Sequence, residues 1–201
     1  MTQVRDTKQR LLDTARELFY ARSYEDVGVQ EICREAGVKK GSFYHFFPSK
    51  RDLTVAMLDE SWIQFRDMLL NDVFVRDIPP VQRILRLLDM QYRLHSEAKA
   101  KTGHVSGCPF GNLAGEMSTR DEVIRERVKR VFRDLEVPIR DVLEEAAAAG
   151  DLPELDSRAT ACAMVAYLEG LSLMAKTHND PDIVKQLGPA ILKLIVLPGE
   201  G

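Results

Sequence analysis

The segment from Val29 to Leu53 most limits the folds open to this chain, because it describes two short helices joined by a tight turn. Its sequence is VQEICREAGVKKGSFYHFFPSKRDL. Val29, Ile32 and Ala36 form an apolar stripe at helical spacing, and the stripe stops at Gly37. Glycine takes a positive φ at little cost, which a sharp turn between crossed helices requires. The pattern predicts a helix-turn-helix.

The second of these helices, expected over residues 39–46, carries groups suited to DNA. Gly41 has no side chain, so the backbone there can approach a phosphate or a base edge. The exposed face is expected to offer five side chains that donate hydrogen bonds, namely Lys39, Lys40, Ser42, Tyr44 and His45. This is the arrangement of a recognition helix that enters the major groove.

The same residues resemble the DNA-binding part of the TetR family of bacterial transcriptional regulators. The resemblance rests on the run AGVKKGSFYHFFPSK and on an upstream helix with Ala15, Leu18 and Phe19. It is ungapped and covers the first part of the chain. The positions in register are Tyr24, Val29, Ile32, Ala36, Gly37, Val38, Gly41, Ser42, Phe43, Tyr44, His45, Phe46, Phe47 and Lys50.

This resemblance implies which residues face DNA. Lys50, near the amino end of the fourth helix, would hold a phosphate where the helix dipole also favours an anion. Lys40 is our candidate for a guanine contact and Tyr44 for a phosphate contact. The full set of implied DNA-binding residues is Lys39, Lys40, Gly41, Ser42, Tyr44, His45 and Lys50.

Two further expectations concern the neighbours of these residues. Phe43, Phe46 and Phe47 are expected to be core residues. Gly28 stands where relatives usually have Ser or Thr at the start of the second helix. Glycine is an acceptable N-cap, but it offers no hydroxyl to a phosphate.

The charge distribution suits a DNA-binding N-terminal domain attached to an acidic C-terminal domain. The chain has 201 residues and a net charge of −3. Residues 1–55 hold ten Lys and Arg against eight Asp and Glu, and the remainder holds 18 against 23. Residues 38–51 hold four basic side chains and no acidic one. This distribution matters more for nucleic-acid binding than the total.

The three cysteines, Cys33, Cys108 and Cys162, are widely spaced and predict neither a disulfide framework nor a metal site. The N-terminus MTQVRDTKQR lacks the pattern of a signal peptide, and no apolar run is long enough to span a membrane. We therefore expect a cytoplasmic protein with no metal, no cofactor and no membrane partner.

Helical periodicity fills nearly the whole chain, so the expected fold is all-α with about nine helices. The first helix is expected over residues 7–22, and Ser49 with Asp52 is expected to cap the fourth. After a helix that begins at Pro80, a break is expected over residues 102–112. A long helix over 121–149 should bury Val123 and bend at Pro138.

The last two helices are expected to begin at Asp156 and at Pro181, with the second ending near residue 197. Residues 1–50 would form a three-helix DNA-binding domain, and residues 51–201 a helical ligand-binding and dimerisation domain. The resemblance implies a homodimer through these last two helices, in which Gly170 and Ala175 would allow close approach. Such a dimer would read a pseudo-palindromic operator in double-stranded DNA.

The segment from Gly107 to Glu116, GCPFGNLAGE, is the most distinctive part of the expected body. Pro109 can begin a short helix with Cys108 as its cap, where the positive potential favours a thiolate. The segment also resembles a Gly-Cys-x-x-Gly-Asn subgroup of the family that senses electrophiles or unsaturated small acids. By that resemblance Cys108 is a sensor thiol, whereas in the alternative interpretation it only fits a crowded bend.

The effector itself is an unknown small molecule. The candidate residues for binding or sensing it are Cys108, Trp62, Phe65, Phe110, Asn112 and Tyr167. Met and aromatic side chains at helical spacing are more often plain core than the lining of a cavity, so this set is a hypothesis.

The sequence thus predicts a ligand-responsive transcriptional regulator, a repressor that a small molecule or an electrophile releases from a palindromic operator. The alternative is a ligand-independent DNA-binding protein or an activator of the same fold. A glycine-rich phosphate loop, a nucleophile elbow and a metal motif are all missing from the sequence, so no enzyme is expected.

Overall fold

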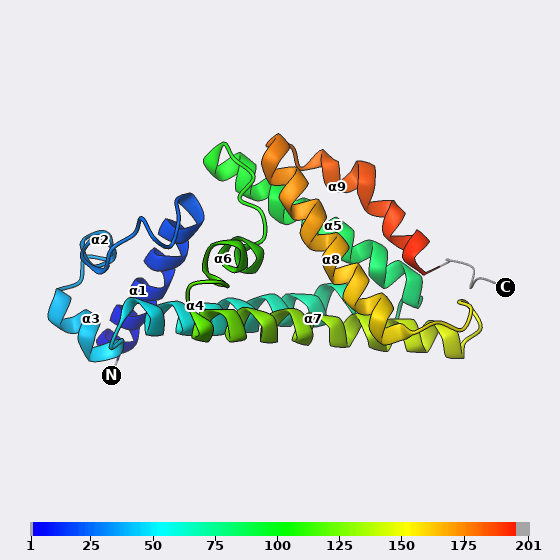
Figure 1. The fold of residues 1–201 in the computed structure, drawn as a ribbon, viewed down its shortest axis with the longest axis horizontal. Helices are drawn as coiled ribbons and strands as arrows, with labels where there is room; N and C mark the ends of the chain where they lie inside the picture. The colour runs from blue at the N-terminus through cyan, green and yellow to red at the C-terminus, as the bar shows by residue number, and fades with distance from the viewer. Residues whose placement is uncertain (1, 196–201) are drawn as a thin grey trace. The chain divides into compact units, whose positions relative to one another are not determined.

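The computed structural model describes the backbone of residues 2–195 and the side chains of residues 6–195 (Figure 1). All regular elements in this range are helical, which confirms the all-α class. The α-helices are α1 (Thr2–Ala21), α2 (Val29–Glu35), α3 (Lys40–Phe46), α4 (Lys50–Met68), α5 (Pro80–Thr102), α6 (Pro109–Met117), α7 (Glu122–Ala148), α8 (Ser157–His178) and α9 (Asp182–Leu187). A π-helical turn, η1 (Leu69–Val73), follows α4, and a 3₁₀ helix, η2 (Gly188–Leu194), follows α9.

The described residues form two compact units. The first unit holds the chain up to Gln64 together with the segment Pro109–Lys129. The second holds Phe65–Cys108 and the described residues from Arg130 onward. The first unit therefore contains α6 and the beginning of α7 as well as α1, α2, α3 and α4 up to Gln64.

In the first unit, the tight turn after α2 forms as the glycine predicts. Gly37 has a φ of +63°, the Gly37 amide donates to Arg34 O at 3.1 Å, and the Val38 amide donates to Cys33 O at 2.8 Å. These two bonds form a Schellman motif, which closes a helix with a left-handed residue. Ile32 on α2 and Phe43 on α3 are fully buried and join the two helices to the core. The predicted helix-turn-helix is confirmed.

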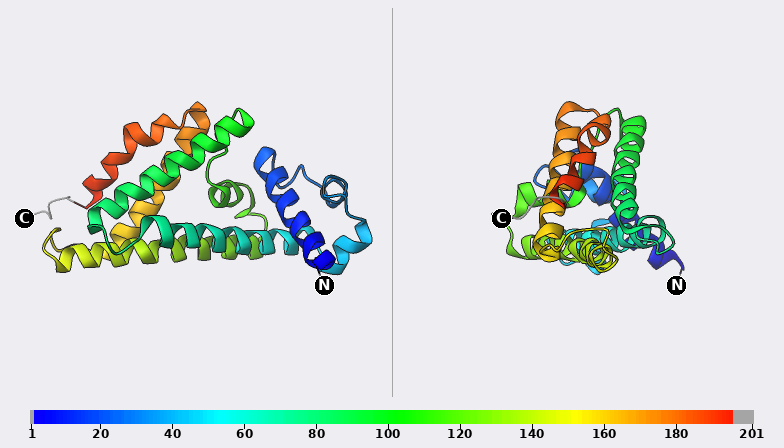
Figure 2. Two further views of the ribbon diagram at one scale, coloured as in Figure 1. Left: turned by 180° about the vertical axis from the view of Figure 1, so that it is seen from behind. Right: turned by 90° about the vertical axis from the view of Figure 1, so that its right-hand side faces the viewer.

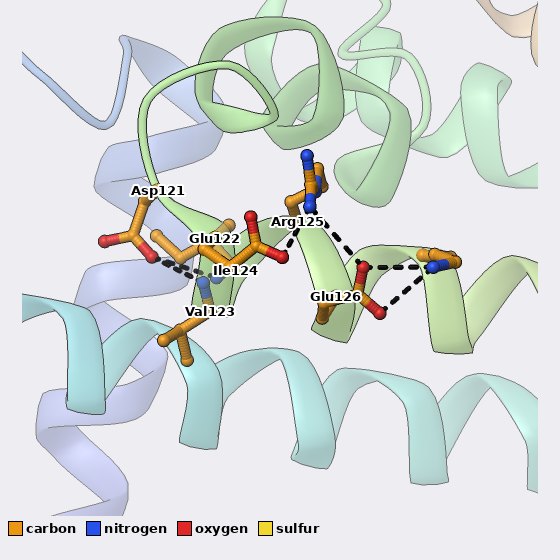
Figure 3. Close-up of polar contacts among 7 residues, drawn as sticks. Asp121, Glu122, Val123, Ile124, Arg125 and Glu126 are labelled. Atoms are coloured by element: carbon orange, nitrogen blue, oxygen red, sulfur yellow. Dashed lines mark hydrogen bonds and ion pairs between the residues drawn. The ribbon is translucent and has the colours of Figure 1, made fainter.

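Side-chain caps fix the starts of α4 and α7. The Ser49 hydroxyl accepts from the Asp52 amide at 3.2 Å and donates to the Asp52 carboxylate at 2.6 Å, as predicted. One carboxylate oxygen of Asp121 accepts from the amides of Val123 and Ile124 at the start of α7 (Figure 3). This register turns Ile124 inward and leaves Val123 47% exposed, so the prediction that Val123 is buried was wrong.

In the second unit, α5, α8 and α9 pack together and lie side by side in both views of Figure 2. Asp156 accepts from the Ala159 amide at 2.9 Å and caps α8, as predicted. A small core cluster is formed by Val105, Ala175 and Val184. Ala175 is thus buried within its own unit, and the expectation that it would face a partner subunit was wrong.

One predicted helix start is confirmed, and one predicted helix end differs from the structure. α6 begins at Pro109 as predicted, so the break after α5 is shorter than the expected residues 102–112. The last helix does not continue from Pro181 to residue 197: α9 ends at Leu187, and the following 3₁₀ helix contains Pro189. Proline lacks an amide donor and clashes with the preceding turn, which explains the break. Residues 196 and 197 lie outside the described residues.

Gly188 also marks the point where the chain passes close to α5. A Cβ atom there would lie 3.1 Å from Leu88 Cδ2, which is closer than ordinary van der Waals contact. Among residues 2–195, none of the helices combines the length and the apolar character that a membrane span needs.

Candidate nucleic-acid interface

The short helix α3 has two faces of different chemistry. Phe43 is fully buried and Phe47 nearly so, while Phe46 is partly buried. These rings attach α3 to the first unit, consistent with the core role expected for them. The opposite face exposes Lys39, Lys40, Gly41, Tyr44 and His45, with Ser42 half-buried beside them.

Lys40 and Tyr44 are brought together on the exposed face of α3. They are four residues apart, and the Lys40 ammonium lies 6.0 Å from the centroid of the Tyr44 ring. Tyr44 is 48% exposed, and its ring packs edge-on against Phe43 with centroids 5.2 Å apart. The tyrosine is therefore held by the core at one edge, while its hydroxyl end is available to a phosphate. A lysine and a tyrosine one helical turn apart suit adjacent contacts along a duplex.

Lys50 is placed differently from the six residues of the recognition helix. Its ammonium donates to Tyr24 O at 2.8 Å and to Val27 O at 3.0 Å. It also lies 3.9 Å from the centroid of the Tyr24 ring. Burial lowers the pKa of Lys50, and the carboxylates of Glu25 and Glu116 partly offset that effect. Two of the three ammonium protons are used within the protein.

The start of α2 agrees with the expectation for Gly28. Gly28 is the N-cap, and no side chain accepts a hydrogen bond at this end of the helix. The Gly28 carbonyl accepts from the amides of Glu31 and Ile32, both at 3.1 Å. A Cβ atom at Gly28 would have no neighbour within 4 Å, so a larger side chain fits there.

The six candidate effector residues are divided between the two units. Trp62, Phe110 and Asn112 belong to the first unit, where Trp62 and Phe110 are buried with ring centroids 6.5 Å apart in an edge-to-face arrangement. Phe65, Cys108 and Tyr167 belong to the second unit. The Tyr167 hydroxyl donates to Leu187 O at 2.7 Å and so joins α8 to the end of α9.

In the second unit the structure pairs Cys108 with a residue that sequence patterns did not identify. The Cys108 thiol hydrogen-bonds to the carboxyl group of Glu169 on α8. Burial raises the pKa of Glu169, and the bond to the thiol partly offsets this shift. A half-buried thiol beside a half-buried acid is a local environment that a crowded bend alone does not require.

A buried polar cluster, formed by Gln91, His95 and Ser172, lies between α5 and α8 of the same unit. The Gln91 side-chain amide donates to Leu168 O and to the Ser172 hydroxyl, both at 2.8 Å. One ring nitrogen of His95 lies 3.2 Å from the same hydroxyl, and burial lowers the pKa of His95. Residues 6–195 contain no group of three or more His, Cys, Asp or Glu side chains placed to hold a metal ion.

The outer face of α8 and the end of α9 expose large apolar side chains. Leu173 is 63% exposed, and Met174 and Leu187 are also exposed. Gly170 lies on the same face of α8 as Leu173, and a Cβ atom there would meet nothing within 4 Å. Exposed apolar side chains gathered on adjacent helices are typical of a surface that binds another protein.

Comparisons with known proteins match both halves of the chain. The family model described as bacterial regulatory proteins, tetR family, matches residues 11–57. The family model described as tetracyclin repressor-like, C-terminal domain, matches residues 80–191.

Two characterised proteins are similar over most of the chain. Transcriptional regulator AcuR of Cereibacter sphaeroides is 34% identical over 176 residues, which are 87% of this chain and 78% of that protein. HTH-type transcriptional repressor NemR of Escherichia coli is 29% identical over 139 residues, which are 69% of this chain and 68% of that protein. The crystal structure of reduced NemR superposes with a TM-score of 0.84 at 26% identity, covering 97% of this chain and all of that one.

Proposed function

Because the chain belongs to the TetR family of DNA-binding transcriptional regulators, we propose that it is a repressor that a small molecule or an electrophile releases from its operator. In this proposal residues 1–50 read DNA, and residues 51–201 bind the effector and the second subunit. The operator is a pseudo-palindrome, because two identical subunits present two recognition helices related by a two-fold axis.

The observation that carries the DNA-binding part is the exposed face of α3. Its lysines, tyrosine and histidine are held outward by buried phenylalanine rings on the other face. In this proposal Lys40 contacts a guanine base directly, and Tyr44 contacts a phosphate. Lys39, Gly41, Ser42 and His45 flank them, and Lys50 contributes its remaining proton to a phosphate.

Dimerisation through α8 and α9 is supported by the apolar side chains that these helices expose. Leu173, Met174 and Leu187 would be covered in the dimer, and Gly170 would allow the two copies of α8 to approach closely. Family members bind DNA as dimers, and these exposed apolar side chains support a dimer through α8 and α9.

The effector part of the proposal rests on Cys108 and its contact with Glu169. A thiol is a nucleophile toward electrophiles, and the adjacent carboxyl group can accept its proton when the thiol reacts. NemR, which shares the fold, has been crystallised in a form described as reduced. A small-molecule effector is a second form of the same proposal.

A double substitution at the recognition helix tests DNA binding. Lys40→Ala with Tyr44→Ala should weaken binding to a selected operator by about 30-fold or more, since a base contact contributes roughly 1–3 kcal/mol in each of two subunits and the phosphate contact is lost as well. Gel-shift titration at fixed salt measures this effect, and circular dichroism should show unchanged helicity. Lys101→Ala, at an exposed lysine of α5, is the matched control. Unchanged operator affinity in the double variant would refute the assignment.

Thiol labelling tests the effector part. A Cys162→Ser background removes the exposed cysteine, so that labelling at neutral pH reports on Cys108 rather than on the surface. We expect N-ethylmaleimide to label Cys108 rapidly and to release operator DNA, and Cys108→Ser to abolish both effects. Labelling that leaves the operator bound would favour the alternative, a ligand-independent DNA-binding protein or an activator of the same fold.

A further inference from the structure

The turn between α1 and α2, residues 22–28, is held by a carboxylate from a distant part of the chain. Glu116 on α6 accepts from the Tyr24 amide at 2.9 Å through one oxygen and from the Glu25 amide at 2.8 Å through the other. A carboxylate that accepts from two consecutive amides fixes both the position and the direction of the peptide. All three residues belong to the first compact unit.

The carbonyl side of the same turn is held by Lys50. Its ammonium donates hydrogen bonds to the carbonyls of Tyr24 and Val27 and lies over the Tyr24 ring. The turn is therefore held between an acid on its amide side and a base on its carbonyl side. This arrangement restricts the turn to one conformation more strongly than either contact alone.

Two ion pairs join the corner between α6 and α7 to the same region. Arg120 lies 3.3 Å from a Glu25 oxygen, and Arg51 lies 3.8 Å from an Asp121 oxygen. The Arg120–Glu25 pair is exposed and contributes little stability. It shows, however, that the corner meets the turn through a second side chain, while Arg51 joins the corner to the start of α4 and Glu116 makes the closest contacts with the turn.

The turn leads directly into the DNA-reading helices. Gly28, its last residue, is the N-cap of α2. Arg22, its first residue, donates to Asp26 O at 3.1 Å and pairs with Glu31 of α2 at 2.6 Å. Since α2 packs on α3, a displacement of the turn changes the direction in which α3 presents Lys40 and Tyr44.

We propose that Glu116 is a positioning residue for operator recognition, and that α6 sets the orientation of the helix-turn-helix through the Tyr24 and Glu25 amides. Pro109, the first residue of α6, directly follows Cys108 in the chain. Cys108 therefore adjoins the start of the helix that holds the turn. This inference rests on the proposed function, since it assumes operator binding.

Glu116→Gln tests the proposal with little change in size. Glutamine has one acceptor oxygen, and its amide nitrogen would face a backbone amide, so one of the two bonds is lost. The matched control is Glu122→Gln, at a carboxylate of α7 that turns toward Arg125 (Figure 3). Both substitutions remove one negative charge, which on its own should strengthen DNA binding or leave it unchanged.

We expect Glu116→Gln to bind an operator selected with the wild-type protein roughly 5- to 50-fold more weakly, in the range of typical coupling between sites. Binding to nonspecific DNA should stay equal or become tighter. Hydrogen exchange at the Tyr24 and Glu25 amides should accelerate. The control should keep wild-type operator affinity and wild-type exchange.

Three results would overturn the proposal. Unchanged operator affinity with accelerated exchange would mean that Glu116 only caps the turn. Equal losses of affinity for operator and for nonspecific DNA would mean that the DNA-binding domain is destabilised as a whole. Unchanged exchange would mean that the carboxylate does not hold the two amides. If the wild-type protein selects no operator, the proposed function fails, and this inference fails with it.

Discussion

Two glycines bracket α2, and the backbone requires only one of them to be glycine. Gly37 has a φ of +63°, a region that costs other residues about 1–2 kcal/mol. Gly28 has a φ of −89° and a ψ of 156°, which any residue adopts readily. Glu31 lies three residues after Gly28, so a serine at position 28 would complete a capping box with it.

Gly28→Ser should therefore stabilise the protein by a few tenths of a kcal/mol, the usual difference between glycine and serine at an N-cap. The added hydroxyl also lies at the amino end of α2, so we expect operator affinity to rise modestly. Urea unfolding and gel-shift titration measure the two effects. Gly37→Ala is the contrasting control and should lose about 1–2 kcal/mol because of its positive φ. A less stable Gly28→Ser protein would show that the site has less room than the structure indicates.

The contact between α5 and α8 depends on an uncharged histidine. His95 is buried beside Ser172, and burial lowers its pKa from the ordinary value of 6.5. The unfolded chain therefore takes up this proton at a higher pH than the folded protein does. Stability should be constant above pH 6.5 with respect to this group and should fall as the pH drops below 6.5.

His95→Gln should remove that part of the pH dependence, since glutamine does not titrate. The slope for one proton is at most about 1.4 kcal/mol per pH unit. Burial raises the pKa of Glu169, which gives a contribution of opposite sign as the pH falls toward 4.5. The difference between wild type and variant isolates His95, because Glu169 is present in both. Parallel stability curves between pH 7.5 and 5.5 would contradict the prediction.

Local signals in the sequence predicted the element boundaries well where a capping group or a glycine marks them. Gly37, Ser49 and Asp156 all act as expected. Pro189 also indicates the break in the last helix, but the apolar pattern continues on both sides of it and favoured one long helix. Proline inside a helical pattern should have ended that prediction earlier.

Contacts between distant parts of the chain could not be predicted in this way. Glu116 and Tyr24 are 92 residues apart, and no periodic pattern relates them. Ala175 was assigned to the wrong face because α8 is apolar on both its inner and its outer side. Periodicity alone cannot separate a face that packs within the subunit from one that a second subunit would cover.

For the molecule as a whole, the proposed function requires that two subunits act on one operator. A ligand can release DNA only if it binds better to the arrangement of the subunits that fits the operator poorly. One subunit alone would contact only half of a palindrome. Linked half-sites bind more tightly than separate ones by roughly 10²- to 10⁴-fold, so loss of the dimer should be visible as loss of operator binding.

Leu173→Glu tests this directly, because Leu173 is the most exposed of the large apolar side chains on α8. A charge in the centre of an apolar interface would be costly to bury, so we expect a folded monomer in sedimentation velocity. Affinity for the full operator should fall by about 100-fold or more, while affinity for a half-operator should not change. Leu70→Glu, at a similarly exposed leucine of η1, is the control and should remain dimeric. A Leu173→Glu protein that stays dimeric and binds the full operator normally would place the subunit interface elsewhere than on α8.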